Sequence, residues 1–525
     1  MIRNHSRHGS RFPITLGGGG YSVNKSLRFR SSASAYLNRT ATSITNTYTL
    51  SVWVKRGTVS GNGRIFQFLN GANTSVYGAL GFYNATDGLV WEFIGTPYVS
   101  TAQYRDPAAW YHIVVNSSGV MYVNGVSVRT GMSAASIASG SIMTIGKNSL
   151  SSGYQFDGEL AEVNFVDGQD LTPTAFGAYS TYNQWLPIAY AGTYGTNGFY
   201  LPFTNTTSTS TLVADSSGNG NNWTPNNISL TAGSTYDSLT DVPTLTSTTV
   251  ANYAVLNPLA NPYAVTIGNV NLTTSNYPVG AAAGPTSTIG VSSGKWYFEF
   301  STVNNIGISA DLEVGIIINA YVSSTYYTVG AQAFTYGFNA SSYYTRANGT
   351  YSGNLGAAGL LTTTDIGSIA YDLDNRVMYL YKNNTLLTSL SLPAGYTWYV
   401  FSGSSSSAAQ SIGANYNFGQ RPFTYTAPSG FLPLNTFNIA AGTVTTSGTF
   451  TGNLSTDGPF VFLNGTPTAM TINGNAVTFG THADKLANGF KVRSSSASYN
   501  ASGSNTYVAT TVGAVFKYED AQGNP

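Results

Sequence analysis

The chain has 525 residues, of which 42% are hydrophobic and only 8% are charged, against about 25% charged in an average protein. It contains no cysteine, which excludes disulfides and thiolate metal sites. No run of about 18 apolar residues occurs, so no membrane-spanning helix is expected. This length and apolar content predict three or four domains with hydrophobic cores, solubilised by hydroxyl and amide groups rather than by charge.

The basic residues are concentrated at the N-terminal end. Ten Lys or Arg residues precede the first acidic residue, Asp87. Residues 1–20 form a basic arm that ends in four glycines, a flexible hinge. Such an arm can dock on an acidic protein surface, or it can be a solvated tail. Nucleic acid is not an expected partner, because no aromatic residues are interleaved with the basic ones. The side chains that would dock the arm are Arg3, Arg7 and Arg11.

Residues 21–180 read as short strands separated by Gly, Asn and Ser turns. The stretch from Tyr48 to Lys55 alternates apolar and polar residues, and Trp110 to Val115 is a more continuously apolar strand. Turn signals recur about every 8–12 residues, which is typical of a β-sandwich. The fold class predicted for the whole chain is all-β, built from β-sandwiches in tandem.

Three motifs in this region resemble laminin-G-like, concanavalin-A-like jelly rolls. They are Trp110-Tyr-His112, the segment from Gly119 to Gly125, and the segment from Phe156 to Val163. The resemblance implies two antiparallel sheets of about six or seven strands each. It also implies a face that binds carbohydrate or protein.

Residues 181–250 are rich in Ser, Thr, Asn and Gly and are predicted to connect two domains. The segment from Asp215 to Trp223 resembles one that recurs in the same jelly-roll group. It either packs on the first domain or joins the first domain to the second. Asp, Ser and Gly in such a run can hold Ca²⁺, but a single carboxylate is present. No cofactor is predicted, with Ca²⁺ as the open alternative.

Residues 251–436 resemble a SPRY domain. The motifs are a strand from Gly294 to Phe300, a buried strand from Val314 to Ile318, a hairpin from Ile366 to Asn383, and a closing segment from Asn417 to Phe423. The resemblance implies a bent β-sandwich that binds protein partners through loops and performs no chemistry. Residues 437–525 are predicted to form a small β domain, with one helical turn ending at Gly489.

The strongest candidate for catalysis is the carboxylate pattern after Phe156. Glycoside hydrolysis needs two carboxylates across the scissile bond. Asp157 and Glu159 share one face of a strand, but Ala161 occupies the next position, and Glu162 faces the other way unless a bulge intervenes. His112 is interpreted as a hydrogen-bonded sheet residue rather than a base. The chain is therefore predicted not to be an enzyme, with polysaccharide degradation as the less favoured alternative.

Binding is the remaining chemistry, since sugar rings stack on exposed aromatic side chains. For each aromatic residue, core packing or a cross-strand aromatic pair is the competing interpretation. The candidates near predicted loops are Trp91, Tyr98 and Tyr154 in the first domain and Tyr327 and Tyr344 in the second.

A jelly roll joined to a SPRY-like domain, without cysteine and with little charge, resembles large adhesive virion proteins of tailed phages. The resemblance implies a tail fibre or receptor-binding protein on the exterior of the particle that contacts host surface polysaccharide or protein. A purely structural capsid decoration or tail protein is the alternative. The arm would dock on other virion proteins, and a homo-oligomer is expected because multivalency raises avidity.

Overall fold

The computed structural model describes residues 21–43, 45–70, 76–133, 136–150, 153–180, 184–278, 284–303, 312–318, 333–338, 343–347, 350–355, 361–404, 409, 411–440, 443–456, 459–462, 466–486 and 489–512. The chain divides into two compact units: one runs from Gly20 to Asn435, and the other contains the residues from Thr436 onward. Arg3, Arg7 and Arg11 of the arm and Tyr327 lie outside the described residues. No described helix is long and apolar enough to cross a membrane.

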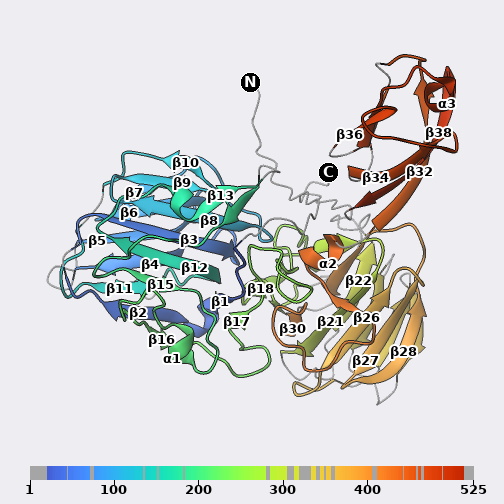
Figure 1. Ribbon diagram of the computed structural model, residues 1–525. Coiled ribbons are helices and arrows are strands. Elements are labelled where there is room, and N and C mark those ends of the chain that lie inside the picture. Colours follow the sequence, from blue (N-terminus) through green and yellow to red (C-terminus); the bar gives the residue numbers. More distant parts are fainter. Residues whose placement is uncertain are drawn as a thin grey trace. The chain divides into compact units, whose positions relative to one another are not determined.

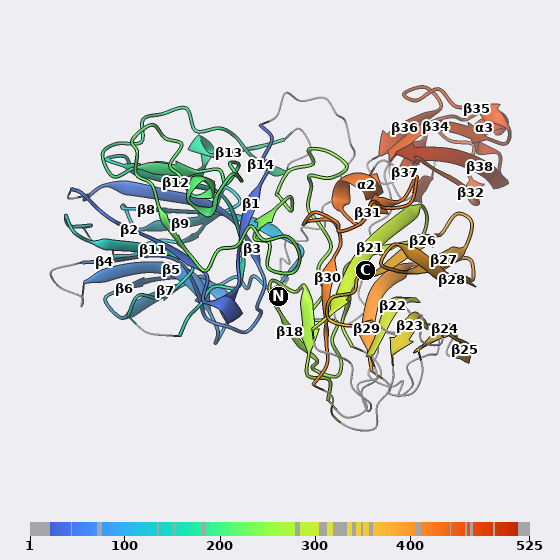
Figure 2. The same ribbon diagram turned by 90° about the horizontal axis from the view of Figure 1, so that it is seen from below.

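The first sandwich contains an eight-stranded and a seven-stranded antiparallel sheet, which form the two layers in Figures 1 and 2. The core of this sandwich lies between the layers. In the eight-stranded sheet the strands are β10 (Val126–Arg129), β9 (Val120–Val123), β8 (Trp110–Asn116), β3 (Tyr48–Arg56), β12 (Gly158–Asp167), β1 (Ser26–Phe29), β17 (Ser238–Leu239) and, beside β12, β15 (Phe199–Leu201). In the seven-stranded sheet they are β16 (Thr224–Asn226), β2 (Tyr36–Thr40), β11 (Ile142–Ile145), β4 (Gly63–Leu69), β5 (Tyr77–Tyr83), β6 (Gly88–Phe93) and β7 (Thr96–Val99).

Alternation along β3 shows why this chain forms a sandwich. Leu50, Val52 and Val54 point into the core between the sheets. Trp53 and Lys55 point to the outer face, because successive residues of a strand face opposite sides. Every residue of β3 is nevertheless buried. The outer face of the eight-stranded sheet must therefore be covered by other parts of the chain.

The segment that was expected to connect two domains is instead part of the first sandwich. Its β15 pairs with β12, its β16 with β2, and its β17 with β1. Phe199 and Trp223 lie in the core, where their rings meet edge to face 5.0 Å apart. Of the two alternatives for the segment from Asp215 to Trp223, packing on the first domain is correct. Burying an aromatic ring of this kind contributes about 1.5–3 kcal/mol, which favours docking of the segment on the sandwich.

Several smaller elements complete the first sandwich. They are η1 (Ser31–Ala33), η2 (Pro173–Ala175), the hairpin of β13 (Gly177–Tyr179) and β14 (Trp185–Pro187), and α1 (Thr209–Leu212). Ser208 caps α1 by accepting a hydrogen bond from the Thr211 backbone N–H. Trp185 of β14 lies over the outer face of the eight-stranded sheet with Trp53 and Trp110.

A second pair of sheets makes up the rest of this unit, which confirms the tandem sandwich prediction. Trp296, Phe298 and Phe300 share one face of β21, and Tyr297 and Glu299 on its other face are buried as well. The eight-stranded sheet contains β18 (Thr266–Gly268), β19 (Thr273–Ser275), β30 (Ala414–Asn417), β21 (Lys295–Thr302), β26 (Gly367–Asp372), β27 (Val377–Lys382), β28 (Thr385–Ser391) and, parallel to β21, β31 (Leu432–Pro433). The six-stranded sheet contains β20 (Thr286–Val291), β29 (Trp398–Gly403), β22 (Leu312–Ile318), β23 (Ala333–Phe338), β24 (Tyr343–Ala347) and β25 (Thr350–Asn354).

The C-terminal unit is also a β domain, as predicted. Phe490 and Ile472 lie at its centre. One sheet contains β32 (Thr443–Gly452), β38 (Gly503–Val512), β34 (Thr466–Ile472) and β35 (Asn475–Ala476), and the other β33 (Phe460–Phe462), β37 (Gly489–Val492) and β36 (Ala483–Leu486). The helices are α2 (Thr436–Ala440) and α3 (Ala497–Asn500). The helical turn expected before Gly489 is wrong: β36 pairs with β37 in a hairpin, and Ala483 is fully buried.

Candidate functional site

The carboxylates that could have served catalysis lie on the covered face of the eight-stranded sheet. Glu159 is completely buried. It pairs in register with Lys55, whose Nζ donates to Asp241 Oδ2 over 2.6 Å. Ser26 Oγ donates to Glu159 Oε2. Burial raises the pKa values of both Glu159 and Asp241, and Lys55 opposes part of each rise. The group is an ion pair of Lys55 and Asp241 beside a buried Glu159, and protein encloses all three side chains.

A bulge brings Glu162 to the same face. The pairing of β12 with β3 slips by one residue between Ala161 and Asn164, and Glu162 has a φ of 52°. The sequence predicted that Glu162 would face away from Asp157 and Glu159 unless a bulge intervened, and the structure contains that bulge. Its carboxylate accepts hydrogen bonds from the hydroxyls of Tyr21 and Tyr200 and is 6% exposed. Because protein groups enclose both Glu159 and Glu162, the pair does not form an open cleft for hydrolysis.

His112 is a neutral, buried residue of β8. Trp185 Nε1 donates to its Nδ1 over 2.9 Å, so the ring proton lies on Nε2, which donates to Ser51 Oγ over 2.8 Å. The imidazole stacks on the rings of Trp53 and Trp185. Burial lowers the pKa of His112 to about 3. The interpretation of His112 as a hydrogen-bonded sheet residue is confirmed.

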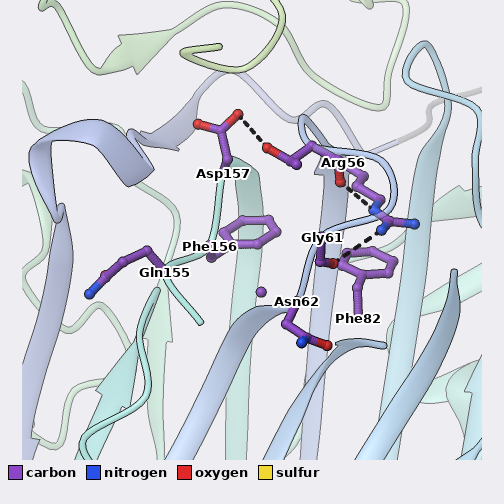
Figure 3. A pocket seen from close by; sticks show the side chains of 9 residues that line it. Arg56, Gly61, Asn62, Phe82, Gln155, Phe156 and Asp157 are labelled. Carbon is purple, nitrogen blue, oxygen red and sulfur yellow. Dashed lines mark hydrogen bonds between the residues drawn. The ribbon is translucent and has the colours of Figure 1, made fainter. Parts of the chain in front are cut away.

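Asp157 lines a small cavity beside the β3–β4 loop (Figure 3). The cavity holds about 10 Å³, roughly the room that one water needs. Arg56 borders it and donates to the carbonyls of Thr58 and Gly61. Asp157 itself accepts from Thr58 Oγ1 and from the backbone N–H of Val270. Asp157 is therefore a buried link to the segment after the first sandwich.

The proposed aromatic contacts of the first sandwich lie in different environments. Trp91 is a core residue, 1% exposed, which leaves neither ring face available to a sugar. Tyr98 packs partly against the same core, and its hydroxyl hydrogen-bonds with Ser133 Oγ. Tyr154 is 40% exposed, and the Arg64 guanidinium lies 5.2 Å from its ring centroid. Tyr344 belongs to β24 of the second sandwich, opposite Gly337.

The outer face of the seven-stranded sheet carries a row of mostly polar residues across all seven strands. The row alternates with core residues such as Leu37, Phe66 and Leu80, so it must face away from the core. We call this surface the polar face. Its central row, in strand order from β16 to β7, is Thr224, Asn38, Thr144, Gln67, Ala79, Glu92 and Pro97.

A loop divides the polar face into two parts. Gln67 donates from Nε2 to Asn148 and accepts from the backbone N–H of Ser149, which holds the loop over the middle of the sheet. On the β6 side of this loop, Tyr77 donates its hydroxyl proton to Glu92, which also forms an ion pair with Arg64. Together with Tyr154, which lies on Arg64, these residues make a partly exposed aromatic and charged patch.

On the β16 side of the loop the polar face is hollowed. The hollow has a volume of about 360 Å³, near the lower end of the range of about 300–1,000 Å³ for ligand pockets. Amide and hydroxyl side chains dominate its walls. The lining residues are Asn38, Arg39, Thr40, Thr42, Gly220, Asn221, Asn222 and Thr224.

Asp215 organises the loop that forms one wall of the hollow. Its carboxylate accepts hydrogen bonds from the backbone N–H groups of Tyr200, Ser217 and Asn221 and from Ser217 Oγ. Gly220, with a φ of 73°, allows the tight turn that brings Asn221 back to this carboxylate. The oxygens considered as Ca²⁺ ligands thus have protein donors. No group of three or more His, Asp or Glu side chains within the described ranges could hold a metal ion.

Sequence reasoning missed the hollow. The segment from Asp215 to Trp223 had been recognised, but its partners Asn38 and Thr40 on β2 lie more than 170 positions away, and no local pattern joins them. The one available signal was the cluster of Gly and Asn residues itself, which indicates a structured loop rather than a linker.

Comparison with known proteins supports the fold of the first sandwich. Residues 29–175 match the family described as the concanavalin A-like lectin/glucanases superfamily. No curated protein matches the chain.

Three solved structures illustrate the similarity. A pentraxin from Limulus polyphemus is 16% identical and covers 29% of this chain and 80% of its own, with a TM-score of 0.24. The SPRY domain of human HERC1 is 17% identical and covers 28% of this chain and 87% of its own, with a TM-score of 0.24. Domains LG4-5 of the mouse laminin alpha1 chain are 11% identical and cover 80% of this chain and 90% of their own, with a TM-score of 0.25. At these values the three structures add nothing to what the sheets themselves show.

Proposed function

We propose that this protein is a non-catalytic, carbohydrate-binding adhesin that holds sugar on the polar face of its first sandwich. The observation that carries the proposal is the hollow beside β2, which is lined by amide and hydroxyl groups. Sugars present many hydroxyls and few apolar atoms, so groups such as Asn38, Thr40 and Asn222 match their hydrogen-bonding needs. Tyr154 supplies an exposed ring on the other part of the same face.

The contrast between the two sheets supports this location. The outer face of the eight-stranded sheet is covered by Trp185 and Val242, and its carboxylates have protein partners. Along β2 of the other sheet, Thr40 is exposed and Asn38 is partly exposed. A ligand can therefore reach this part of the polar face without displacing any other segment of the protein.

A glycan array probed with the full chain tests the proposal. Binding to at least one class of polysaccharide is expected. Thr40→Trp, which fills the hollow, should weaken that binding, whereas Thr96→Trp on β7 at the far end of the same sheet should not. No binding to any glycan would overturn the proposal. Release of reducing sugar by the unaltered chain would favour the polysaccharide-degrading alternative instead.

We further propose that the protein acts on the exterior of a phage particle, as a tail fibre or receptor-binding protein that contacts host surface polysaccharide. The support is the resemblance drawn from the sequence: two joined sandwich modules, no cysteine and few charges. In this proposal Arg3, Arg7 and Arg11 dock the arm on other virion proteins, the chain assembles as a homo-oligomer, and Tyr327 and Tyr344 provide contacts from the second sandwich.

Deletion of residues 1–20 tests the docking step. The shortened chain should be lost from purified particles while still binding glycan. If it is incorporated as before, the arm does not dock the protein. If the full chain is found in the particle but binds no host envelope material, it is a structural decoration or tail protein.

A further inference from the structure

One loop crosses the polar face and is fixed to it at three points. The loop joins β11 to β12 and begins beside β2, where the Lys147 ammonium lies 3.6 Å from the ring centroid of Tyr36. In its middle it is hydrogen-bonded to Gln67 of β4. Near its end, the carbonyl of Tyr154 accepts from the Arg64 backbone N–H, and the Tyr154 ring lies on the Arg64 guanidinium. We call this segment the crossing loop, and these attachments present its exposed side chains in one arrangement.

Three large apolar side chains are exposed along a route over the polar face. Leu150 and Tyr154 belong to the crossing loop and are 44% and 40% exposed. Ile142 of β11 is 41% exposed. Because it alternates with the core residue Met143, Ile142 lies on the polar face, where it pairs in register with Thr40 at the hollow. The route therefore leads from the hollow over the crossing loop to Tyr154.

The two ends of this route are too far apart for a small sugar to contact both. Asn38 of the hollow and Glu92 of the patch around Arg64 lie in one row of the sheet, on β2 and β6. Strands β11, β4 and β5 separate them, which places the two residues about 19 Å apart at the usual spacing of strands. A disaccharide contacts one end only, whereas an extended chain of several sugars contacts both.

The far end of the route suits a sugar as well as the hollow does. The Tyr154 ring lies on Arg64, which pairs with Glu92, and the Glu92 carboxylate remains partly exposed. An exposed ring beside a carboxylate offers a stacking surface for the C–H groups of a sugar and an acceptor for its hydroxyls. Leu150, between the two ends, adds an apolar contact.

We propose that the polar face binds an extended stretch of polysaccharide, several sugars long, which passes from the hollow over Leu150 to Tyr154. Contacts at two ends of one rigid sheet make the second contact intramolecular, which raises affinity by about 10²–10⁴. The fixed crossing loop keeps the cost of ordering the protein low. This inference rests on the proposed function and names the ligand class of the same site, a linear polymer rather than a single sugar.

A length series tests the inference with the full chain. The probes are the disaccharide and progressively longer fragments of the polysaccharide that the glycan array selects, each titrated by calorimetry. A fragment that spans both ends should bind at least about a hundredfold more tightly than the disaccharide, the lower limit of the gain from linked contacts. Each chain should bind one such fragment, since both ends belong to the same sheet.

Variants on the crossing loop assign the gain to the route. Leu150→Ser should weaken binding of the spanning fragment several-fold and leave the affinity for the disaccharide unchanged. Tyr154→Ala should show the same selective loss. Val126→Ser is the matched control and should bind as the unaltered chain does, because Val126 is a 57% exposed apolar residue on β10 of the other sheet. Each variant is expected to keep its unfolding midpoint, because all three side chains are exposed.

The outcomes separate this inference from the proposed function. Equal affinity for the disaccharide and the spanning fragment overturns the inference and leaves the proposed function standing. The same conclusion follows if Leu150→Ser and Tyr154→Ala bind the spanning fragment normally while Thr40→Trp weakens it, because the hollow alone would then hold the sugar. No binding to any glycan overturns both.

Discussion

Lys55 and Asp241 form an ion pair, with Nζ and Oδ2 2.6 Å apart, in which neither side chain is exposed to solvent. The same Nζ donates to Asn252 Oδ1 and to the carbonyl of Tyr253. A lysine of the first sandwich is thereby bound to the chain that leads into the second. Buried charges are tolerated only when paired and hydrogen-bonded, and Lys55 has three acceptors.

Lys55→Met should therefore be strongly destabilising. It leaves Asp241 and Glu159 buried without their shared cation, at an expected cost of about 3–5 kcal/mol in the free energy of unfolding. Lys382→Ala is the control, because Lys382 lies 3.7 Å from Asp365 near the surface, where such pairs contribute about 0–1 kcal/mol. Urea unfolding followed by tryptophan fluorescence measures both. Similar losses in the two variants would contradict the role of Lys55.

Acidification should destabilise the first sandwich through His112. An unfolded histidine binds a proton below its ordinary pKa of 6.5, but the folded His112 remains neutral down to about pH 3. Stability should thus fall as pH drops through this window, by up to about 1.4 kcal/mol per pH unit. His112→Gln should remove this contribution. Between about pH 7.5 and pH 4 the unaltered chain should therefore lose more unfolding free energy than the variant does. A constant difference would refute the assignment.

Trp91 and Tyr154 should behave differently on truncation. Trp91→Ala leaves a cavity in the core and should cost about 3–5 kcal/mol of stability. Tyr154→Ala removes a partly exposed ring and should change stability by no more than about 0.5 kcal/mol. It should instead weaken polysaccharide binding several-fold, as measured by calorimetry. If Tyr154→Ala binds polysaccharide with unchanged affinity, the patch around Arg64 does not take part in binding.

The segment after β14 should be as important for stability as the strands of the jelly-roll motifs. Trp223→Ala is expected to cost about 3–5 kcal/mol, because its ring packs on Phe199 inside the core. Tyr179→Ala, at a residue that is 50% exposed, is the control and should be nearly neutral. Thermal unfolding compares the two. A neutral Trp223 variant would mean that the first sandwich does not depend on this segment.

Local patterns were sufficient to predict several strands. The alternation from Tyr48 to Lys55 appears as β3 and the apolar run from Trp110 as β8, because period-two burial is a property of neighbouring residues. The bulge at Glu162 could only be stated as a condition. It depends on how β12 pairs with β3, more than 100 positions earlier.

Long-range packing explains what the sequence could not show. Trp91 lies beside a predicted loop in the sequence, but β6 lies within the seven-stranded sheet and turns its ring inward. Phe199 pairs across from Phe165, and nothing around Phe199 distinguishes a core strand from a connecting segment. The hydrogen bonds of Arg39 could not be predicted for the same reason, since its partners Asn197 and Asn221 come from a distant part of the chain.

The first and last strands of the first sandwich are hydrogen-bonded neighbours, with Ser26 opposite Leu239 and Leu27 opposite Ser238. The chain therefore enters and leaves this domain at one edge of one sheet. Tension along the chain would first have to break the buried pair between Lys55 and Asp241, and it would then peel the short strand β17 from β1 one bond at a time. It would not need to shear the core. On a surface exposed to drag, such an edge would extend and reseal while the seven-stranded sheet stays intact.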